Sequence, residues 1–262
     1  MRIRLDAEMV RRGLARSREH AVEQIESGLV SVKGLPANKA ATQVDAETSI
    51  TVKSTGEEYV SRGGHKLAGA LDSFSQITVA DKIALDAGAS TGGFTDVLLR
   101  RGAKKVIAVD VGYGQLAWSL QNDSRVEIHD RTNVRNLTRQ LISDEPELVV
   151  ADLSFISLTL VLRALIEVAH PDADFLIMVK PQFEVGREKL GAGGVVREPH
   201  LRAEAVRDVA EGARSVGLGT LGVVASPLPG PSGNVEYFLW MRRGDAKIPM
   251  EKILEAVSKG PQ

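Results

Sequence analysis

Short apolar runs alternate with helical patterns along most of the chain, from residue 83 onward. A continuous apolar run is typical of a buried strand, whereas apolar residues at helical spacing are typical of an amphipathic helix. The runs predict strands at 83–86, 105–110, 126–129, 147–152, 174–180, 218–225 and 235–242. The helical patterns lie at 94–101, 115–121, 134–142, 158–169 and 199–216. This alternation predicts an α/β domain in which helices cover both faces of a parallel sheet.

The final strand should break the parallel order. Only the loop 226–234 separates the last two predicted strands, and it is too short for a crossover helix. We therefore expect a seven-stranded sheet whose last strand is antiparallel. A further helix is predicted at 65–74, ahead of the first strand. The glycine-rich segment 183–198 predicts a long mobile loop, of a length that usually serves a function or is disordered.

The N-terminal part has a different pattern. Short helices are predicted at 6–12 and 18–27, and short strands at 29–32 and 49–53. We interpret residues 1–54 as a small α+β domain, residues 55–64 as a polar linker and residues 65–262 as the α/β domain. A domain of the smaller size buries little core and is marginal alone.

Composition and charge exclude several classes of protein. The chain has 33 Lys and Arg residues against 34 Asp and Glu, so it is not a globally basic nucleic-acid binder. It has no cysteine, which excludes disulfide scaffolds, cysteine zinc sites and cysteine nucleophiles, and we expect no metal site. The charged N-terminus and the lack of a long apolar stretch predict a cytoplasmic protein without a signal peptide or membrane segment.

A glycine-rich turn follows the first predicted strand and opens a helix, which is the context of a cofactor site. Its glycine spacing differs from the dinucleotide fingerprint, because Ser90 stands at one glycine position. Asp86 and Asp110 end neighbouring strands, where carboxylates can meet an ammonium group and the hydroxyls of a ribose. S-adenosylmethionine carries both groups. A dinucleotide site and an ordinary tight turn remain the alternatives.

Four ionisable residues are expected at one edge of the sheet. Asp152 and Lys180 end apolar strands, and Glu236 begins the antiparallel strand, so all three should lie at the carboxyl edge where α/β sheets bind ligands. Lys66 lies on the helix that precedes the sheet. Charges beside a core are costly unless they are paired or used. Each could instead be a surface charge or a structural ion pair.

Arginines are frequent near the N-terminus. The candidate RNA-binding residues are Arg2, Arg4, Arg11, Arg12, Arg16 and Arg18, together with Arg62. Because only Asp6 and Glu8 oppose the first six, this part predicts a local positive strip that could bind phosphates. A solvated helical face is the alternative interpretation.

Several longer motifs resemble one family. They are Ser61-Arg62-Gly63-Gly64-His65-Lys66-Leu67, residues 86–95, Asp110-Val111-Gly112-Tyr113-Gly114-Gln115-Leu116, Asp152-Leu153-Ser154-Phe155-Ile156-Ser157, Lys180-Pro181-Gln182-Phe183-Glu184-Val185-Gly186 and Ser232-Gly233-Asn234-Val235-Glu236-Tyr237. Across nearly the whole chain the sequence is similar to the TlyA family of S4-domain-containing rRNA 2′-O-methyltransferases, also named hemolysin A. That family resembles the FtsJ-type ribose methyltransferases, whose Lys-Asp-Lys-Glu tetrad falls on Lys66, Asp152, Lys180 and Glu236.

The resemblance implies a Rossmann-like class I methyltransferase domain after an S4-like RNA-binding domain. It implies transfer of a methyl group from S-adenosylmethionine to cytidine 2′-hydroxyls of 16S or 23S rRNA, in ribosomal subunits, by a monomer that binds no membrane. Lys180 would be the general base, Lys66 would lower its pKa and hold substrate, and the two acids would orient the lysines. The candidate cofactor-binding residues are Asp86, Gly88, Ser90, Thr91, Gly92, Gly93, Phe94, Asp110, Asp130, Asn133 and Asp152.

Three other functions remain open at this point. A non-catalytic RNA-binding or ribosome-assembly factor could keep the same fold, and it would be favoured if the four ionisable residues failed to converge. A small-molecule methyltransferase fits the sheet but not the arginine-rich N-terminal part. A membrane-active hemolysin would need an amphipathic or spanning apolar segment, and the sequence shows none.

Overall fold

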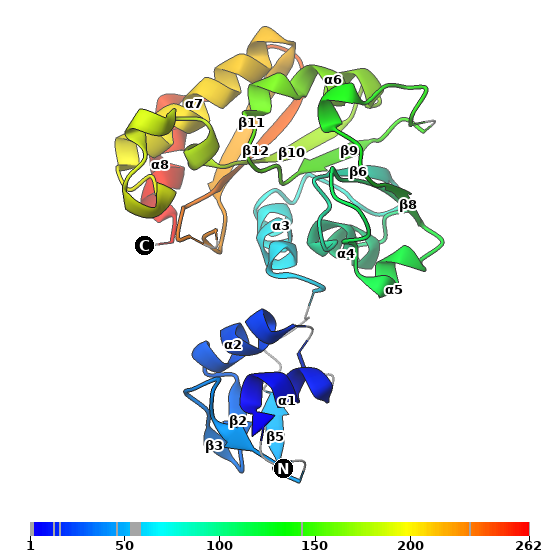
Figure 1. Ribbon diagram of the computed structural model, residues 1–262. Coiled ribbons are helices and arrows are strands. Elements are labelled where there is room, and N and C mark those ends of the chain that lie inside the picture. The colour runs from blue at the N-terminus through cyan, green and yellow to red at the C-terminus, as the bar shows by residue number, and fades with distance from the viewer. Residues whose placement is uncertain are drawn as a thin grey trace. The chain divides into compact units, whose positions relative to one another are not determined.

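The chain forms two compact units, residues 1–58 and 59–262, which are drawn in Figure 1. The structure is a computed structural model that describes residues 3–12, 14–15, 17–45, 47–52, 59–142, 144–230 and 232–261. The division of the chain at 54 and 64 stays a prediction, because residues 53–58 lie outside the described ranges. In the larger unit the first helix, α3, spans Arg62–Ser73 and so begins earlier than predicted.

A seven-stranded sheet forms the centre of the larger unit. Its strands are β6 (Ile83–Ala87), β7 (Lys105–Val109), β8 (Val126–His129), β9 (Leu148–Ala151), β10 (Asp174–Val179), β11 (Leu218–Ala225) and β12 (Tyr237–Arg243), in the spatial order β11-β12-β10-β9-β6-β7-β8. Neighbouring strands are parallel, except that β12 runs antiparallel to β10 and β11. This confirms the predicted α/β fold with an antiparallel last strand.

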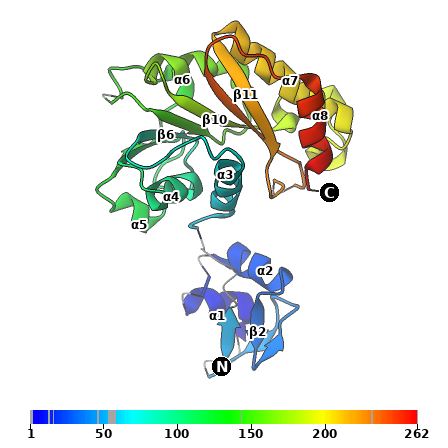
Figure 2. The same cartoon turned by 180° about the vertical axis from the view of Figure 1, so that it is seen from behind.

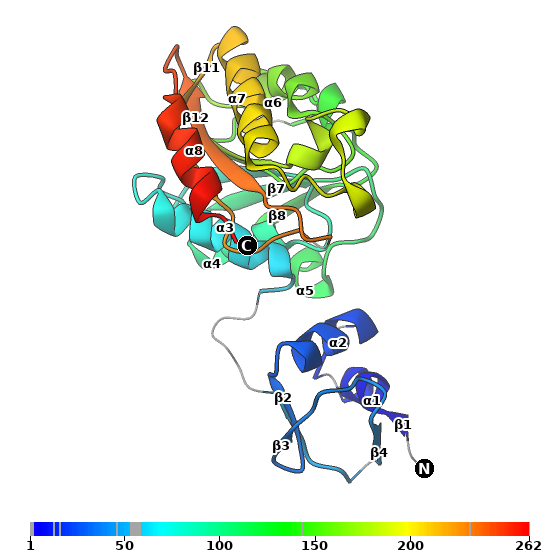
Figure 3. The same ribbon diagram turned by 90° about the vertical axis from the view of Figure 1, so that its left-hand side faces the viewer.

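Helices cover both faces of this sheet, as Figure 3 shows. On one face, α3, α4 (Gly93–Arg100) and α5 (Trp118–Gln121) pack on strand residues such as Val106 and Met178. On the other face, α6 (Leu162–Val168), α7 (Pro199–Ser215) and α8 (Met250–Lys259) pack on residues such as Ile107. Fully apolar strands fit because both of their faces are buried.

Some predicted helices are shorter than expected. The segment 134–142 forms only a 3-10 turn, Val134–Asn136, after which Leu137 is extended. Its Asn and Thr residues favour local side-chain bonds to the backbone over a helix. The segment 115–121 is helical only from Trp118, because the Ala117 amide donates to the carbonyl of Thr91 instead. The segment 158–169 splits into a 3-10 turn, Leu158–Leu160, and α6.

The segment 183–198 is not the structureless loop that its glycines suggest. It follows the 3-10 turn Pro181–Phe183 and contains two more, Arg187–Lys189 and Ala192–Gly194. Its apolar residues Val185 and Val196 are buried against α7. The side chain of Asn234 accepts a hydrogen bond from the Val196 amide at 2.9 Å and donates one to the carbonyl of Gly194 at 3.1 Å. The loop is therefore attached to the residues that precede β12.

The smaller unit is visible from behind in Figure 2. It contains α1 (Leu5–Arg11) and α2 (Arg18–Glu26), the antiparallel strands β2 (Val30–Val32), β3 (Leu35–Pro36) and β5 (Ile50–Val52), and a separate pair of β1 (Ile3–Arg4) with β4 (Gln43–Val44). The two-residue strands β1, β3 and β4 are too short to show a periodic pattern and were not predicted. The core of the unit includes Leu5, Met9 and Ile25, each almost fully buried.

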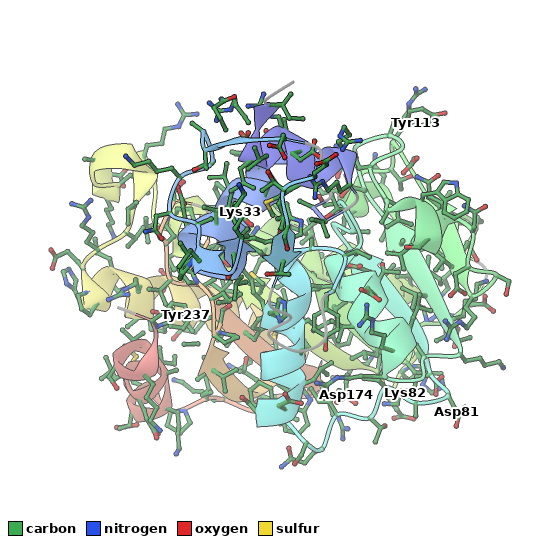
Figure 4. All side chains as sticks on the ribbon, turned by 90° about the horizontal axis from the view of Figure 1, so that it is seen from below. Lys33, Asp81, Lys82, Tyr113, Asp174 and Tyr237 are labelled. Carbon is green, nitrogen blue, oxygen red and sulfur yellow. The ribbon has the colours of Figure 1, made fainter. Side chains whose placement is uncertain are left out.

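An acidic residue also starts β10, at the opposite edge of the sheet from the predicted site. Asp174 is buried and accepts hydrogen bonds from Arg242 and the indole of Trp240. The Nζ of Lys82 lies 3.3 Å from its carboxylate. Figure 4 labels both Lys82 and Asp174. Burial raises the pKa of Asp174, but the bonds from Arg242 and Trp240 outweigh it, so the net shift is downward. This charge is fully paired and serves the packing of the strand ends.

Candidate active site

Two ion pairs occupy the carboxyl edge of the sheet and account for the four predicted ionisable residues. Lys66 on α3 donates to Glu236 at 2.6 Å, and both side chains are buried. The Nζ of Lys180 lies 2.6 Å from Oδ1 of Asp152. It also donates to Oγ of Ser154 at 2.8 Å. Asp152 follows β9, Lys180 follows β10 and Glu236 precedes β12. These three strands are neighbours in the sheet, because β10 lies between β9 and β12.

The two ion pairs also act on each other. Burial raises the pKa of Glu236 above its ordinary value, against the opposing effect of Lys66. The charges of Lys180 and Asp152 reach the same carboxylate with smaller effects, one lowering and one raising its pKa. The four groups therefore form one electrostatically coupled set. A coupled set of this kind is more frequent at functional sites than elsewhere.

The glycine turn brings the chain close to this set. Gly88 has a φ of +89°, and a Cβ at this position would lie 2.6 Å from the backbone carbonyl oxygen of Asp152. Gly92, with a φ of +95°, is the residue before α4. Only glycine fits a left-handed backbone with so little space. The turn therefore allows the loops after β6 and β9 to approach each other.

A cavity of about 830 Å³ lies beside the turn, a volume typical of small-molecule sites. Of the predicted cofactor-binding residues, those that line it are Gly88, Ser90, Asp110, Asn133 and Asp152. Asp110 accepts hydrogen bonds from the Ser90 and Gly112 amides at 2.9 and 2.7 Å, which orient its carboxylate. The other predicted cofactor-binding residues do not line the cavity; they are Asp86, Thr91, Gly92, Gly93, Phe94 and Asp130. Asp130 accepts a hydrogen bond from the Gly114 amide instead.

Asp86 is the most perturbed acid of the site. It is fully buried and accepts a hydrogen bond from Oγ1 of Thr95 at 2.7 Å, while its Oδ1 has no partner among the described residues. Burial raises its pKa to about 7, and the charges of Asp152 and Asp110 act in the same direction. A buried carboxylate oxygen without a donor is costly, so the site fits a ligand that brings a cation or a hydrogen-bond donor.

Sequence reasoning assigned no role to Phe155, although it lies in a motif that carries the family resemblance. Its side chain is 90% exposed at the cavity, and its backbone has a φ of +64°. Its ring packs on that of Phe183, with centroids 5.1 Å apart. An exposed aromatic ring on a left-handed backbone is unusual in packing terms. A positive φ cannot be inferred from the residue type, so no local signal could have identified this geometry.

The N-terminal arginines are more strongly paired than expected. Arg4 and Arg18 bond to buried Asp6, and Arg11 and Arg12 bond to buried Glu8. Hydrogen bonds from Arg4 lower the pKa of Asp6 to about 2, and those from Arg11 and Arg12 do the same for Glu8. Arg2 and Arg16 lie outside the described residues. Arg62 begins α3 in the larger unit and is exposed.

Arg12 differs from the other three arginines. Its side chain is only 22% exposed, and it donates to the backbone carbonyls of Thr48 and Asp45 at 2.7 and 2.9 Å. It therefore joins α1 to the segment before β5. Arg4, Arg11 and Arg18 keep about half of their side-chain surface exposed. Their guanidinium groups can therefore contact a phosphate in solution, although the carboxylates that they pair with are buried.

Replacing Arg12 with alanine should loosen the smaller unit, because Glu8 and two backbone carbonyls lose donors. Residues 1–58 contain no Phe, Trp or Tyr, so amide hydrogen exchange of α1 and α2 in the full chain is the suitable measurement. We expect protection to fall about tenfold or more. The exposed Lys39→Ala variant is the control. Equal protection in both variants would show that Arg12 has no structural role.

Two other features of the described residues bear on the class of protein. No group of three or more His, Asp or Glu side chains there is arranged to hold a metal ion. None of the helices in the described ranges is both long enough and apolar enough to cross a bilayer.

Known protein families match both units. The FtsJ-like methyltransferase model matches residues 59–243, and the S4 domain model matches residues 3–50. The 16S/23S rRNA (cytidine-2′-O)-methyltransferase TlyA of Mycobacterium tuberculosis is 58% identical over 99% of both chains. Hemolysin A of Brachyspira hyodysenteriae is 37% identical over 90% of this chain and 98% of its own.

Solved structures agree with these sequence matches. A Streptococcus thermophilus protein that has been named a hemolysin superposes with a TM-score of 0.79 at 37% identity, over 98% of this chain and 95% of its own. The N-methyltransferase NodS of Bradyrhizobium japonicum, at 13% identity and a TM-score of 0.50 over 68% of this chain and 96% of its own, shares the fold alone. The chain therefore belongs to the FtsJ-like methyltransferase family, and its residues 3–50 form an S4 domain.

Proposed function

We propose that this protein is an S-adenosylmethionine-dependent 2′-O-methyltransferase of cytidine riboses in 16S or 23S rRNA, acting on ribosomal subunits. The observation that carries the proposal is the double position of Asp152, which pairs with Lys180 and also lines the cavity. A group held in that cavity would therefore lie next to the coupled lysines and acids. The relative from M. tuberculosis bears the name of this activity.

The residues of the cavity suit the proposed cofactor. S-adenosylmethionine would supply an activated methyl group on a positively charged sulfur. The oriented carboxylate of Asp110, in the cavity lining, suits ribose hydroxyls. Asp86 is buried outside that lining, and its unpartnered oxygen suits an ammonium group that reaches the end of β6. Gly88 itself places no side chain between the turn and the Asp152 carbonyl.

In this proposal the charged side chains prepare the substrate hydroxyl. A ribose 2′-hydroxyl is a poor nucleophile until a base takes its proton. Lys180 would accept that proton at Nζ as a neutral amine, after its ammonium form has released a proton to solvent. Asp152 and Ser154 both contact the Nζ of Lys180 and would hold it in place. The buried Lys66–Glu236 pair would fix the neighbouring wall of the site. Placement of the hydroxyl should supply much of the rate.

The smaller unit would supply affinity for RNA. Its S4 match and the half-exposed Arg4, Arg11 and Arg18 support contacts to phosphates. A guanidinium suits this task because its planar donors bind phosphate in a bidentate manner.

The proposal is tested with purified small and large ribosomal subunits that lack the modification. They are incubated with the protein and with S-adenosylmethionine labelled in the methyl group, and the label is mapped by mass spectrometry of rRNA fragments. We expect label on cytidine riboses of one or both subunits. Binding to subunits without any label would instead favour an RNA-binding assembly factor.

A further inference from the structure

Two neighbouring loops of the site are held together by several contacts. The loop after β9 carries Ser154 and Phe155, and the loop after β10 carries Lys180 and Phe183. Lys180 donates to Ser154 at 2.8 Å, and the two phenylalanine rings pack with centroids 5.1 Å apart. Both loops follow strands that are paired in parallel. The position of Ser154 and Phe155 thus depends on the loop after β10.

Glu184 adds the contact that fixes the far end of the loop after β9. One of its carboxylate oxygens accepts a hydrogen bond from the Leu158 amide at 2.9 Å, and the other accepts one from Oγ of Ser157 at 2.7 Å. Leu158 is buried and begins a 3-10 turn. The carboxylate therefore caps this turn, as an acid often does at a helix start.

The carboxylate of Glu184 lacks the cationic partner that a half-buried acid usually has. Within the described ranges it forms no ion pair with a Lys, Arg or His side chain. Burial raises its pKa, and the charge of Asp208 acts in the same direction. Its contacts lie in a single turn of the loop after β9. Leucine or valine would fill such a half-buried position at lower cost, so packing alone does not explain an acid here.

We propose that Glu184 is a positioning residue for methyl transfer: by holding residues 157–158, it keeps Ser154 and Phe155 beside Lys180. This inference rests on the proposed function. Glu184 acts through the loop and does not touch the reacting groups. Its loss should allow the loop to move away from Lys180, and a displacement of about 1 Å in a site can lower a rate by about 100-fold.

The test compares Glu184→Ala, Glu184→Gln and Glu188→Ala in the full chain. Glu188 is an exposed acid of the same segment and serves as the matched control. We expect Glu184→Ala to lower kcat on ribosomal subunits by about 10- to 100-fold. The Kd for S-adenosylmethionine should rise by a smaller factor, because residues 153–157 also line the cavity. Glutamine keeps an oxygen for the Leu158 amide, so Glu184→Gln should recover most of kcat. The control should match the wild type.

Amide hydrogen exchange without substrate provides an independent measurement. In Glu184→Ala, exchange should accelerate at residues 154–158 and stay unchanged in β10, with Glu184→Gln in between. This result is expected even if wild-type protein methylates no RNA, so failure of the proposed function would be recognised separately. Unchanged exchange at residues 154–158, a wild-type kcat in Glu184→Ala, or faster exchange throughout the larger unit would each overturn the inference.

Discussion

Replacing Lys180 with alanine is expected to reduce methyl transfer to rRNA by about 100- to 10,000-fold, the usual contribution of a positioned general base. The folded structure and the affinity for S-adenosylmethionine should remain, because Lys180 follows β10 and does not line the cavity. Removing the amine leaves Asp152 without its cationic partner, which should if anything strengthen the binding of a cationic ligand.

Single-turnover kinetics measures the rate of methyl transfer, and calorimetric titration measures the affinity for S-adenosylmethionine. Together they separate a loss of catalysis in the Lys180 variants from a loss of cofactor binding. Lys189→Ala is the control, because Lys189 is an exposed lysine of the following segment and pairs only with Glu204 among the described residues. Lys180→Met keeps the volume of the side-chain stem without its amine, and it should be as inactive as Lys180→Ala. Wild-type rates in both Lys180 variants would rule out this lysine as the base.

Replacing Asp86 with asparagine should stabilise the ligand-free protein at pH 8 and at the same time weaken cofactor binding. The pKa of Asp86 is about 7 in the folded state, against an ordinary value of 3.8. Between these values the folded state holds a proton that the unfolded state has lost, so the free energy of unfolding falls as the pH rises from about 4 to about 7. The ionised carboxylate thus destabilises the fold above pH 7 by up to about 4 kcal/mol.

Asparagine removes this charge but leaves a buried amide group without an acceptor. That unpaired group lowers the free energy of unfolding by about 1–3 kcal/mol. We expect a net gain of about 1–3 kcal/mol at pH 8 that shrinks as the pH falls and becomes a loss of about 1–3 kcal/mol near pH 4, measured by thermal unfolding over this pH range. Asp81→Asn is the control, because Asp81 is exposed and asparagine tolerates its left-handed backbone. A pH-independent difference between the Asp86→Asn variant and wild type would contradict the role given to burial.

The loss of cofactor affinity is the second part of this prediction. A neutral amide cannot balance an ammonium group, so the Kd for S-adenosylmethionine should rise by about tenfold or more. At pH 8 the Asp86→Asn variant would then be more stable than wild type but bind the cofactor more weakly. Such a trade-off is common for residues of functional sites. An unchanged Kd would remove Asp86 from the cofactor site.

The sheet could be predicted because its strands are apolar on both faces and its connections have characteristic lengths. The short loop 226–234 was enough to predict that β12 is antiparallel, and from that the place of Glu236 at the carboxyl edge. Helix α8 was not predicted, although Ile253, Ala256 and Val257 have helical spacing. The 3-10 turn at 134–136 is capped by Asn133, whose Oδ1 accepts a hydrogen bond from the Arg135 amide at 3.0 Å, and an apolar pattern does not reveal such a cap.

The sequence was enough to predict at which edge of the sheet the site lies, but not which side chains pair with each other there. Strand ends place Asp152 and Lys180 together, but the partner of Lys66 lies 170 positions away and depends on the whole sheet. The charge of the N-terminal part was misleading in a similar way. Asp6 and Glu8 are only two acids among many arginines, yet their burial lets each hold two of them.

The Lys66–Glu236 pair has a consequence for synthesis of the protein on the ribosome. Lys66 belongs to the first helix of its unit, and Glu236 precedes the last strand of the sheet. A nascent chain that ends before residue 236 would have to bury an ammonium group without its counter-ion, which is strongly unfavourable. We therefore expect the carboxyl edge of the sheet to form only after residue 236 has been translated, and a chain that terminates before it to lack methyl transfer.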